Sequence, residues 1–169
     1  MCLLVLVLAN LMEAQDDLFC QSFLHHFMRH YLRGFIEAYN KRNIDSLDEF
    51  VAPDYVDHTN NIQGLEGLKQ MMNMGLKGVP DWHETIEDII AEGDKVWVSL
   101  AYTGTHTGEM FGITPTGNKI TTTAVDIYRI VDGKLAEYWN VTDKLGLYKP
   151  QGIIEYTEKG KVLFPEDVE

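Results

Sequence analysis

Hydrophobic positions in the first half of the chain recur every three or four residues, which predicts helices. The first helix ends at Asn43, and Asp45 or Ser46 can cap a short second helix. A third helix is predicted over GLEGLKQMMNMGLKGVPD, where Gly78 and Pro80 end it. One brief extended piece, PDYVDHTN, lies between the second and third helices. The apolar face of the first helix holds Phe27, Tyr31, Phe35, Ala38 and Tyr39.

From Trp82 onward the hydrophobic period becomes two, which predicts strands. Two strands flank the turn Glu92-Gly93-Asp94, and two longer ones flank Asp132-Gly133, so both pairs are expected to form hairpins. Helices followed by hairpins predict an α+β fold, with helices packed on one side of an antiparallel sheet. In the strand after the first turn, one face is predicted to hold Val96, Val98, Leu100 and Tyr102.

Composition narrows the classes of partner. The 169 residues suffice for one domain with a real core, and 45% of them are hydrophobic. The net charge of -12 argues against nucleic acid and against anionic membranes as partners. The two cysteines, Cys2 and Cys20, form no disulfide framework and no Cys-x-x-Cys motif. The scattered histidines do not have the spacing of a zinc site, so no metal is expected.

The first fifteen residues, MCLLVLVLANLMEAQ, contain an apolar run from Cys2 to Ala9 and lack the basic residue that usually precedes the apolar part of a signal sequence. The apolar run is also too short to span a bilayer, so no stable membrane insertion is expected. Three interpretations of this segment stay open: a degenerate targeting segment, a start-site extension and an additional helix. A cytoplasmic location is the default expectation. The chain is therefore divided into an N-terminal extension (1–29), one domain (30–152) and a peripheral tail (153–169).

Four stretches resemble the SnoaL-like polyketide cyclases of the NTF2-like superfamily. They are FIEAYNKRNIDSLDEFVAPDYVDH, GLEGLKQMM, VPDWHETIEDIIAEGDKVWVSLAYTGTHTGEMFGITPTGNKI and VDIYRIVDGKLAEYWNVTDKLGLYKPQG. The resemblance implies a cone-shaped barrel, in which a curved sheet wraps around a pocket covered by N-terminal helices. It also implies a homodimer through the sheet. The implied activity is an aldol-type ring closure without metal or organic cofactor, with Asp143 at the position of the acid/base aspartate.

The segment EYWNVTD places Glu137, Trp139, Val141 and Asp143 on one face if the strand is regular. If Trp139 is the pocket floor, Asp143 lies in an apolar setting that raises its pKa and suits it to acid/base work. The alternative is that Asp143 caps the following helical turn.

Three further residues are candidates for catalysis. Arg129 could lower the pKa of Asp143 or bind a developing oxyanion, if its face is concave. The alternative for Arg129 is an outward side chain that pairs with Asp126 or Glu137. His58 and His106 could hydrogen-bond a substrate carbonyl or a water, although each could equally satisfy local backbone groups.

Large aromatic side chains could line an apolar pocket for a flat ring system, although such side chains more often form the core. The residues predicted to contact substrate are Tyr39, Trp82, Phe111 and Trp139. The sequence thus favours a cyclase or isomerase that acts on a small hydrophobic carbonyl compound. One alternative is a binding protein without turnover. Another is an epoxide hydrolase that uses Asp126, Arg129 and Asp143.

Overall fold

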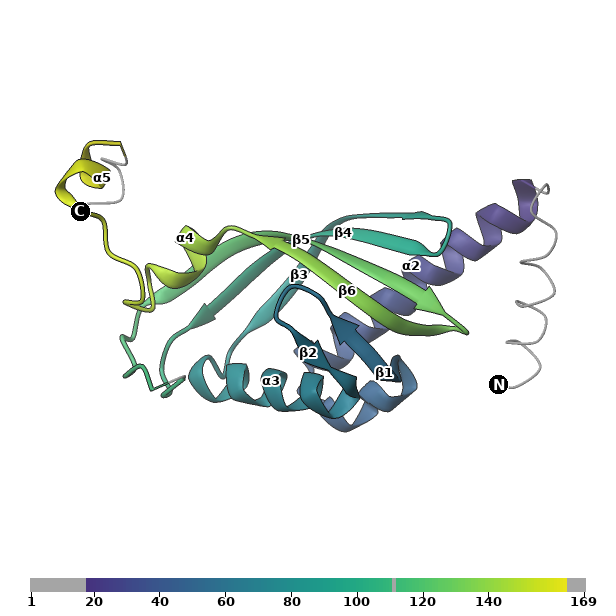
Figure 1. Ribbon diagram of the computed structural model, residues 1–169, viewed down its shortest axis with the longest axis horizontal. Helices are drawn as coiled ribbons and strands as arrows, with labels where there is room; N and C mark the ends of the chain where they lie inside the picture. The colour runs from purple at the N-terminus through teal and green to yellow at the C-terminus, as the bar shows by residue number, and fades with distance from the viewer. Residues whose placement is uncertain (1–17, 111, 164–169) are drawn as a thin grey trace.

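Alternating side chains divide the strands into a buried face and an exposed face, and this alternation organises the fold. The computed structural model describes residues 18–110 and 112–163 (Figure 1). The elements in chain order are α2 (Leu18–Asn40), the 3₁₀ helix η1 (Ile44–Glu49), β1 (Val51–Asp57), β2 (Ile62–Gln63), α3 (Gly64–Gly78), β3 (His83–Glu92), β4 (Lys95–Thr105), β5 (Lys119–Val131), β6 (Lys134–Thr142), α4 (Lys144–Tyr148) and α5 (Glu158–Leu163).

The six strands form one curved sheet in the order β2-β1-β6-β5-β4-β3. Its neighbours are antiparallel except β1 and β6, which run parallel, so the expectation of an antiparallel sheet is wrong at that pair. The sheet is not closed, and α2 and α3 lie beside it (Figure 1). The predicted α+β class, with helices followed by hairpins, is confirmed.

Both predicted hairpin turns are present. Gly93 has a φ of 60°, while Asp132 and Gly133 have φ values of 50° and 74°. Two consecutive positive φ angles are typical of a type I′ turn, whose twist matches that of the flanking strands. The caps expected for the second helix are wrong, because η1 begins after Asn43, and the Ser46 hydroxyl donates to the Asn43 carbonyl.

The inner face of the sheet, defined here as the face that packs against α2, holds the core. Strand β4 buries the four residues that its pattern predicts, and β5 buries its even-numbered residues. The rings of Phe35 on α2 and Tyr128 on β5 meet edge to face at 5.9 Å, which fixes the helix on the sheet. The α2 side chains in this core are Met28, Leu32, Phe35, Ile36 and Tyr39.

The two ends of the described chain differ from the central domain. Helix α2 runs without interruption across the predicted boundary at residue 30. Helix α5 stands apart from the sheet (Figure 1) and has no buried residues. Within the part of the chain that the structure describes, no helix is long and apolar enough to cross a membrane.

Candidate active site

A carboxyl group lies in the middle of the inner face, where a core residue would be expected. Asp126 on β5 is 3% exposed. Its Oδ2 accepts hydrogen bonds from the hydroxyls of Tyr102 (3.1 Å) and Tyr128 (3.2 Å). Its Oδ1 accepts from Asn140 Nδ2 at 2.6 Å, and the Asn140 oxygen in turn accepts from Thr142. Three strands therefore converge on one acid.

The sheet register explains why these side chains meet. Asp126 lies opposite Asn140 on β6, so the two side chains share a face and are close together. Tyr128 is two residues farther along β5 and also points inward. Burial raises the pKa of Asp126, and the hydrogen bonds from Asn140 and the tyrosines lower it only in part. The ionised form of Asp126 is therefore costly in free energy at this buried position. Carboxyls with a pKa raised in this way are typical of sites that transfer protons.

A second carboxyl, that of Glu84 on β3, lies on the same inner face. Glu84 is the cross-strand neighbour of Tyr102, and its Oε1 accepts from Trp82 Nε1 at 3.3 Å. Burial raises the pKa of Glu84 to about 8, and the negative charge of Asp126 contributes to the shift. Part of the Glu84 surface is nevertheless accessible, whereas Asp126 is enclosed.

Helix α2 holds the Glu84 backbone in place. The amide of Asn40 donates from Nδ2 to the Glu84 carbonyl at 2.8 Å and accepts from the Glu84 N–H at 2.9 Å. The ring of Trp82 is tilted against that of Tyr102, with 5.2 Å between centroids. Burial also raises the pKa of the Tyr39 and Tyr102 hydroxyls. These hydroxyls stay protonated at neutral pH and can act only as neutral donors and acceptors.

The structure contradicts the apolar setting expected for Asp143. The residue is exposed and caps α4, because its Oδ1 accepts from the N–H groups of Leu145 and Gly146 at 3.1 Å each. The alternative interpretation of Asp143 as a helix cap is the one that the structure supports.

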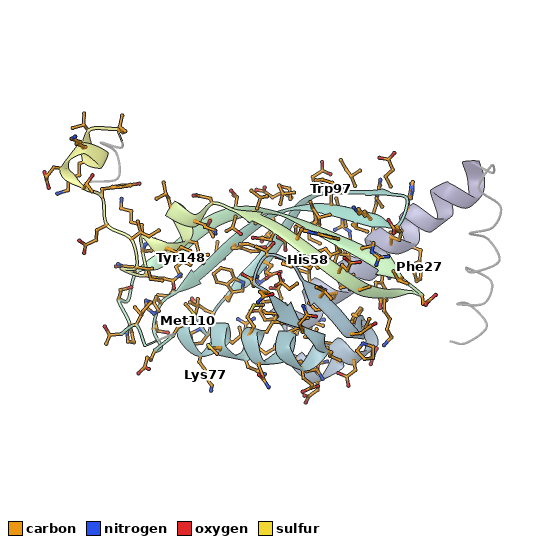
Figure 2. All side chains as sticks on the ribbon, in the orientation of Figure 1. Phe27, His58, Lys77, Trp97, Met110 and Tyr148 are labelled. Atoms are coloured by element: carbon orange, nitrogen blue, oxygen red, sulfur yellow. The ribbon has the colours of Figure 1, made fainter. Side chains whose placement is uncertain are left out.

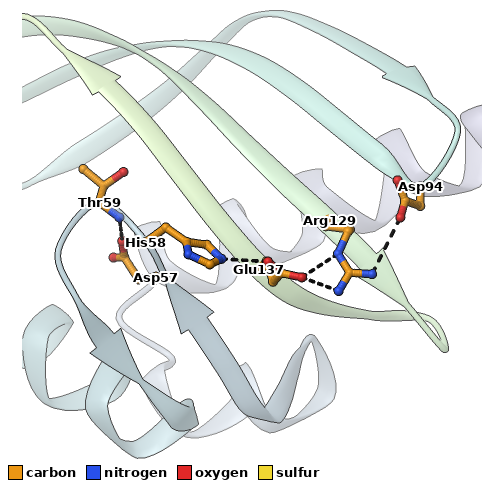
Figure 3. A network of polar contacts seen from close by, with 6 residues as sticks. All are labelled: Asp57, His58, Thr59, Asp94, Arg129 and Glu137. Atoms are coloured by element: carbon orange, nitrogen blue, oxygen red, sulfur yellow. Dashed lines mark hydrogen bonds and ion pairs between the residues drawn. The ribbon is translucent and has the colours of Figure 1, made fainter.

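Arg129 lies on the outer face of the sheet, so the concave position that its catalytic interpretation requires is not the one it occupies (Figure 3). Its Nε donates to Glu137 Oε1 at 2.7 Å, and its guanidinium also lies 3.7 Å from Asp94. The other Glu137 oxygen lies 2.7 Å from His58 Nε2. Hydrogen bonds from His58 and Arg129 lower the pKa of Glu137. Arg129 therefore pairs outward, as its alternative interpretation proposed.

His58 and Trp139 pack together on this outer face, with stacked rings 4.6 Å apart. Lys95 Nζ lies 5.1 Å from the Trp139 centroid. The expectation that Trp139 forms a pocket floor is wrong. A β-bulge in the β5–β6 pairing is the reason, since Leu135 is buried while Asn140, five residues later, also points inward.

The remaining predicted residues lie in three different places. Trp82 donates to Glu84, and the charge of Glu84 contributes to the raised pKa of Tyr39, so both predicted residues belong to the neighbourhood of this carboxyl. His106 is fully buried just beyond β4, where its Nδ1 lies 3.2 Å from Thr116 Oγ1. Phe111 falls outside the described residues. Asp126 is buried, Arg129 faces outward and Asp143 caps α4, so the structure does not assemble the proposed epoxide hydrolase trio.

The sequence analysis did not identify Asp126 and Glu84 as two acids on the same inner face. The sequence gives Asp126 a place only as an ion-pair partner of Arg129 and in the epoxide hydrolase alternative, and it does not single out Glu84. The alternation in β4 could have found them, because the same antiparallel register that buries Tyr102 places Glu84 beside it and turns Asp126 inward. Within the described ranges, no group of three or more His, Cys, Asp and Glu side chains could hold a metal ion.

Comparison with known proteins gives consistent matches. The family profile named SnoaL-like polyketide cyclase matches residues 29–150. Aklanonic acid methyl ester cyclase DauD of Streptomyces sp. (strain C5) is 30% identical over 124 residues, which is 69% of this chain and 76% of that protein. Nogalonic acid methyl ester cyclase of Streptomyces nogalater is 26% identical over 122 residues, covering 69% of this chain and 91% of that protein.

Solved structures agree with the fold. TsrD from Streptomyces laurentii superposes with a TM-score of 0.70 at 28% identity, covering 76% of this chain and 97% of that one. A structure described as a putative polyketide cyclase from Bacillus cereus has a TM-score of 0.66 at 33% identity, with 76% and 83% covered. Sequence and structure comparisons thus identify the same group of relatives.

Proposed function

Because the chain belongs to the family of SnoaL-like polyketide cyclases, we propose that it closes a carbon ring by an intramolecular aldol reaction on a small hydrophobic carbonyl compound. Proton transfer by its own side chains suffices for this chemistry. The observation that carries the proposal is the pair of inner-face carboxyls, Glu84 and Asp126, placed on either side of Tyr102.

Glu84 is the acid/base group of the proposed reaction. The residue is half-buried, its carboxyl accepts a hydrogen bond from Trp82, and burial raises its pKa to about 8. A general base works best when its pKa is close to the operating pH. Ionised Glu84 removes a proton from the carbon beside a substrate carbonyl and leaves an enolate. The enolate carbon attacks a second carbonyl, and protonated Glu84 returns the same proton to the resulting alkoxide.

Asp126 is a positioning residue in this scheme. Three hydrogen bonds from Tyr102, Tyr128 and Asn140 hold its charge, which makes Glu84 more basic. The Tyr39 hydroxyl, which stays protonated because burial and the charge of Glu84 raise its pKa, provides a neutral donor for the enolate or alkoxide oxygen. Helix α2 and the aromatic rings of Tyr39 and Trp82 supply the apolar surface against which a hydrophobic substrate would pack.

The names of the relatives suggest the substrate class. Aklanonic acid methyl ester and nogalonic acid methyl ester are the compounds in the names of the matching cyclases. We therefore expect this chain to cyclise a methyl ester of this kind.

The experiment incubates the purified protein with each of the two esters and separates the products by chromatography with mass detection. Aldol closure forms an isomer, so a new peak of unchanged mass is the expected product. Glu84→Gln should lose at least 100-fold in kcat, in the range of general acid/base catalysis. Glu92→Gln, at the exposed end of the same strand, is the matched control and should be unaffected. Tight binding of both esters without a product would favour the non-catalytic binding alternative.

A further inference from the structure

Two fully buried side chains each leave one polar atom without a hydrogen-bond partner among the described residues. They are Nε2 of His106, which is 0% exposed, and Oε1 of Gln151, which is 1% exposed. An unpaired buried polar atom costs about 1–3 kcal/mol, so such atoms are rare in native proteins. Two of them in one region point to a partner that the chain itself does not supply.

Both side chains belong to the same corner of the fold. The His106 ring lies 3.2 Å from the hydroxyl of Thr116, which donates to the carbonyl of Pro150 at 2.9 Å. Gln151 follows Pro150 directly. Met110 and Tyr148, labelled in Figure 2, mark this end of the molecule, where the loop after β4 meets the segment after α4.

His106 directly follows β4 and continues the row of inward-facing side chains of that strand. It follows Tyr102 by four positions, and the residues between them alternate so that Gly104 is buried as well. Four residues of strand span about 13 Å. A substrate whose reacting carbons lie near Glu84 and Tyr102 would therefore extend along the inner face toward His106.

The chemistry of the two atoms restricts what can bind between them. Gln151 Nε2 donates to the Leu147 carbonyl at 2.9 Å, which fixes the amide orientation and leaves Oε1 as an acceptor only. His106 Nε2 is a donor in one tautomer and an acceptor in the other. A carbonyl or ether oxygen cannot satisfy Gln151, because it has no hydrogen to donate. A hydroxyl donates its one hydrogen to Gln151 Oε1, and its oxygen then accepts from His106 Nε2 in the tautomer that has its hydrogen on Nε2. In that tautomer Nδ1 accepts from the Thr116 N–H, which lies 3.4 Å away.

We propose that His106 and Gln151 form a hydroxyl-binding subsite that anchors the end of the substrate remote from the reacting carbons. The subsite rests on the proposed function, since it assigns a feature of the substrate to the same interior. It makes an O–H group at that end a determinant of specificity. The loss of such a group should weaken binding strongly, because two buried atoms would again be unpaired.

The test uses the full-length protein labelled with ¹⁵N and observes the ring nitrogens of the histidines by NMR. Phenol and anisole are the probes, since they differ by a hydroxyl against a methyl ether. Phenol should shift the His106 Nε2 resonance and bind about tenfold or more tightly than anisole, which corresponds to one net hydrogen bond. Equal shifts with both probes would overturn the proposal, because the corner would then be a simple apolar site.

A trapped water is the competing occupant. If water magnetisation reaches the His106 ring and phenol does not displace that exchange, the subsite belongs to a structural water and the proposal fails. Gln151→Leu should abolish the preference for phenol, while Gln70→Leu on the exposed side of α3 should keep it. Glu84→Gln should leave phenol binding intact, so a failure of ring closure and a failure of the subsite give different results.

Discussion

Replacement of Asp126 by Asn removes a buried charge and nearly preserves the shape of the side chain. If the Asp126 charge contributes to the high pKa of Glu84, that pKa must fall in Asp126→Asn. Burial, which is the larger cause of the Glu84 shift, stays in place, so the pKa should remain above its ordinary value.

The structure gives the size of the effect. Glu84 lies beside Tyr102 across the β3–β4 pair, and the Tyr102 hydroxyl donates to Asp126 at 3.1 Å. About one tyrosine side chain therefore separates the two carboxyls, and we take a distance of about 8 Å for the Coulomb interaction. Two unit charges at that distance and an effective dielectric constant of about 20 interact by about 2 kcal/mol, or about 1.5 pKa units. The Glu84 pKa of about 8 should therefore drop by about one unit or slightly more.

Two measurements check this shift. Carbon NMR of the Glu84 carboxyl follows its titration directly, without any need for activity. The pH dependence of kcat/KM with aklanonic acid methyl ester should lose rate on the acid side, because protonation disables the base, and that limb should move to lower pH in Asp126→Asn. Asp54→Asn, at an exposed position in β1, is the control. A Glu84 pKa that stays at 8 or rises in Asp126→Asn would refute the electrostatic coupling of the pair.

Further predictions concern stability, capping and assembly. Because folding raises the Glu84 pKa, the native state binds the proton more tightly and loses stability as the pH rises from about 4.5 to 8. Glu84→Gln should therefore gain about 4 kcal/mol relative to wild type at pH 9 compared with pH 5, by chemical denaturation at both pH values. Asp143→Ala should lower stability by about 1 kcal/mol through loss of the α4 cap, with kcat changed less than twofold, and a large fall in kcat would restore Asp143 as the acid/base. The outer face exposes Trp97 and Val125, so we expect a homodimer through this face that Trp97→Glu converts to monomer in sedimentation experiments, and an unchanged sedimentation coefficient would contradict it.

The fold was predictable because it follows from local patterns. The alternation of Val96, Val98, Leu100 and Tyr102 correctly separated the two faces of β4, and glycine turns correctly located both hairpins. The last strand failed for a physical reason. If strict alternation continued from the buried Leu135, Glu137 and Trp139 would point inward. The bulge adds one residue to β6, so Tyr138 and Asn140 point inward instead.

The bulge also explains why the sequence predicted an apolar setting for Asp143, which the structure places at the exposed cap of α4. If Trp139 lies in the interior, alternation places Asp143 there as well, and Asp126 has a role only as a partner of Arg129 or in the epoxide hydrolase alternative. The long-range register that places Asp126 opposite Asn140 depends on the bulge, which the local pattern of neither strand contains. Buried polar residues of this kind are where local rules fail most often, since function and not stability keeps them there.

An inner face made only of apolar side chains is compatible with this sheet. The free energy that is lost when polar groups are buried there therefore needs an explanation. Hydrophobic residues of similar volume in place of Asp126, Glu84 and their tyrosine partners would in general be neutral or stabilising. Asp126 lies opposite Val98 and on the same face as Leu100, so its neighbours on the adjacent strand are core residues with which an apolar side chain would be compatible. Two acids on one buried face, each with a raised pKa and one of them accessible, instead form an arrangement suited to moving a proton. The stability lost by their burial is the physical reason to expect that Glu84→Gln produces a more stable protein that no longer closes a ring.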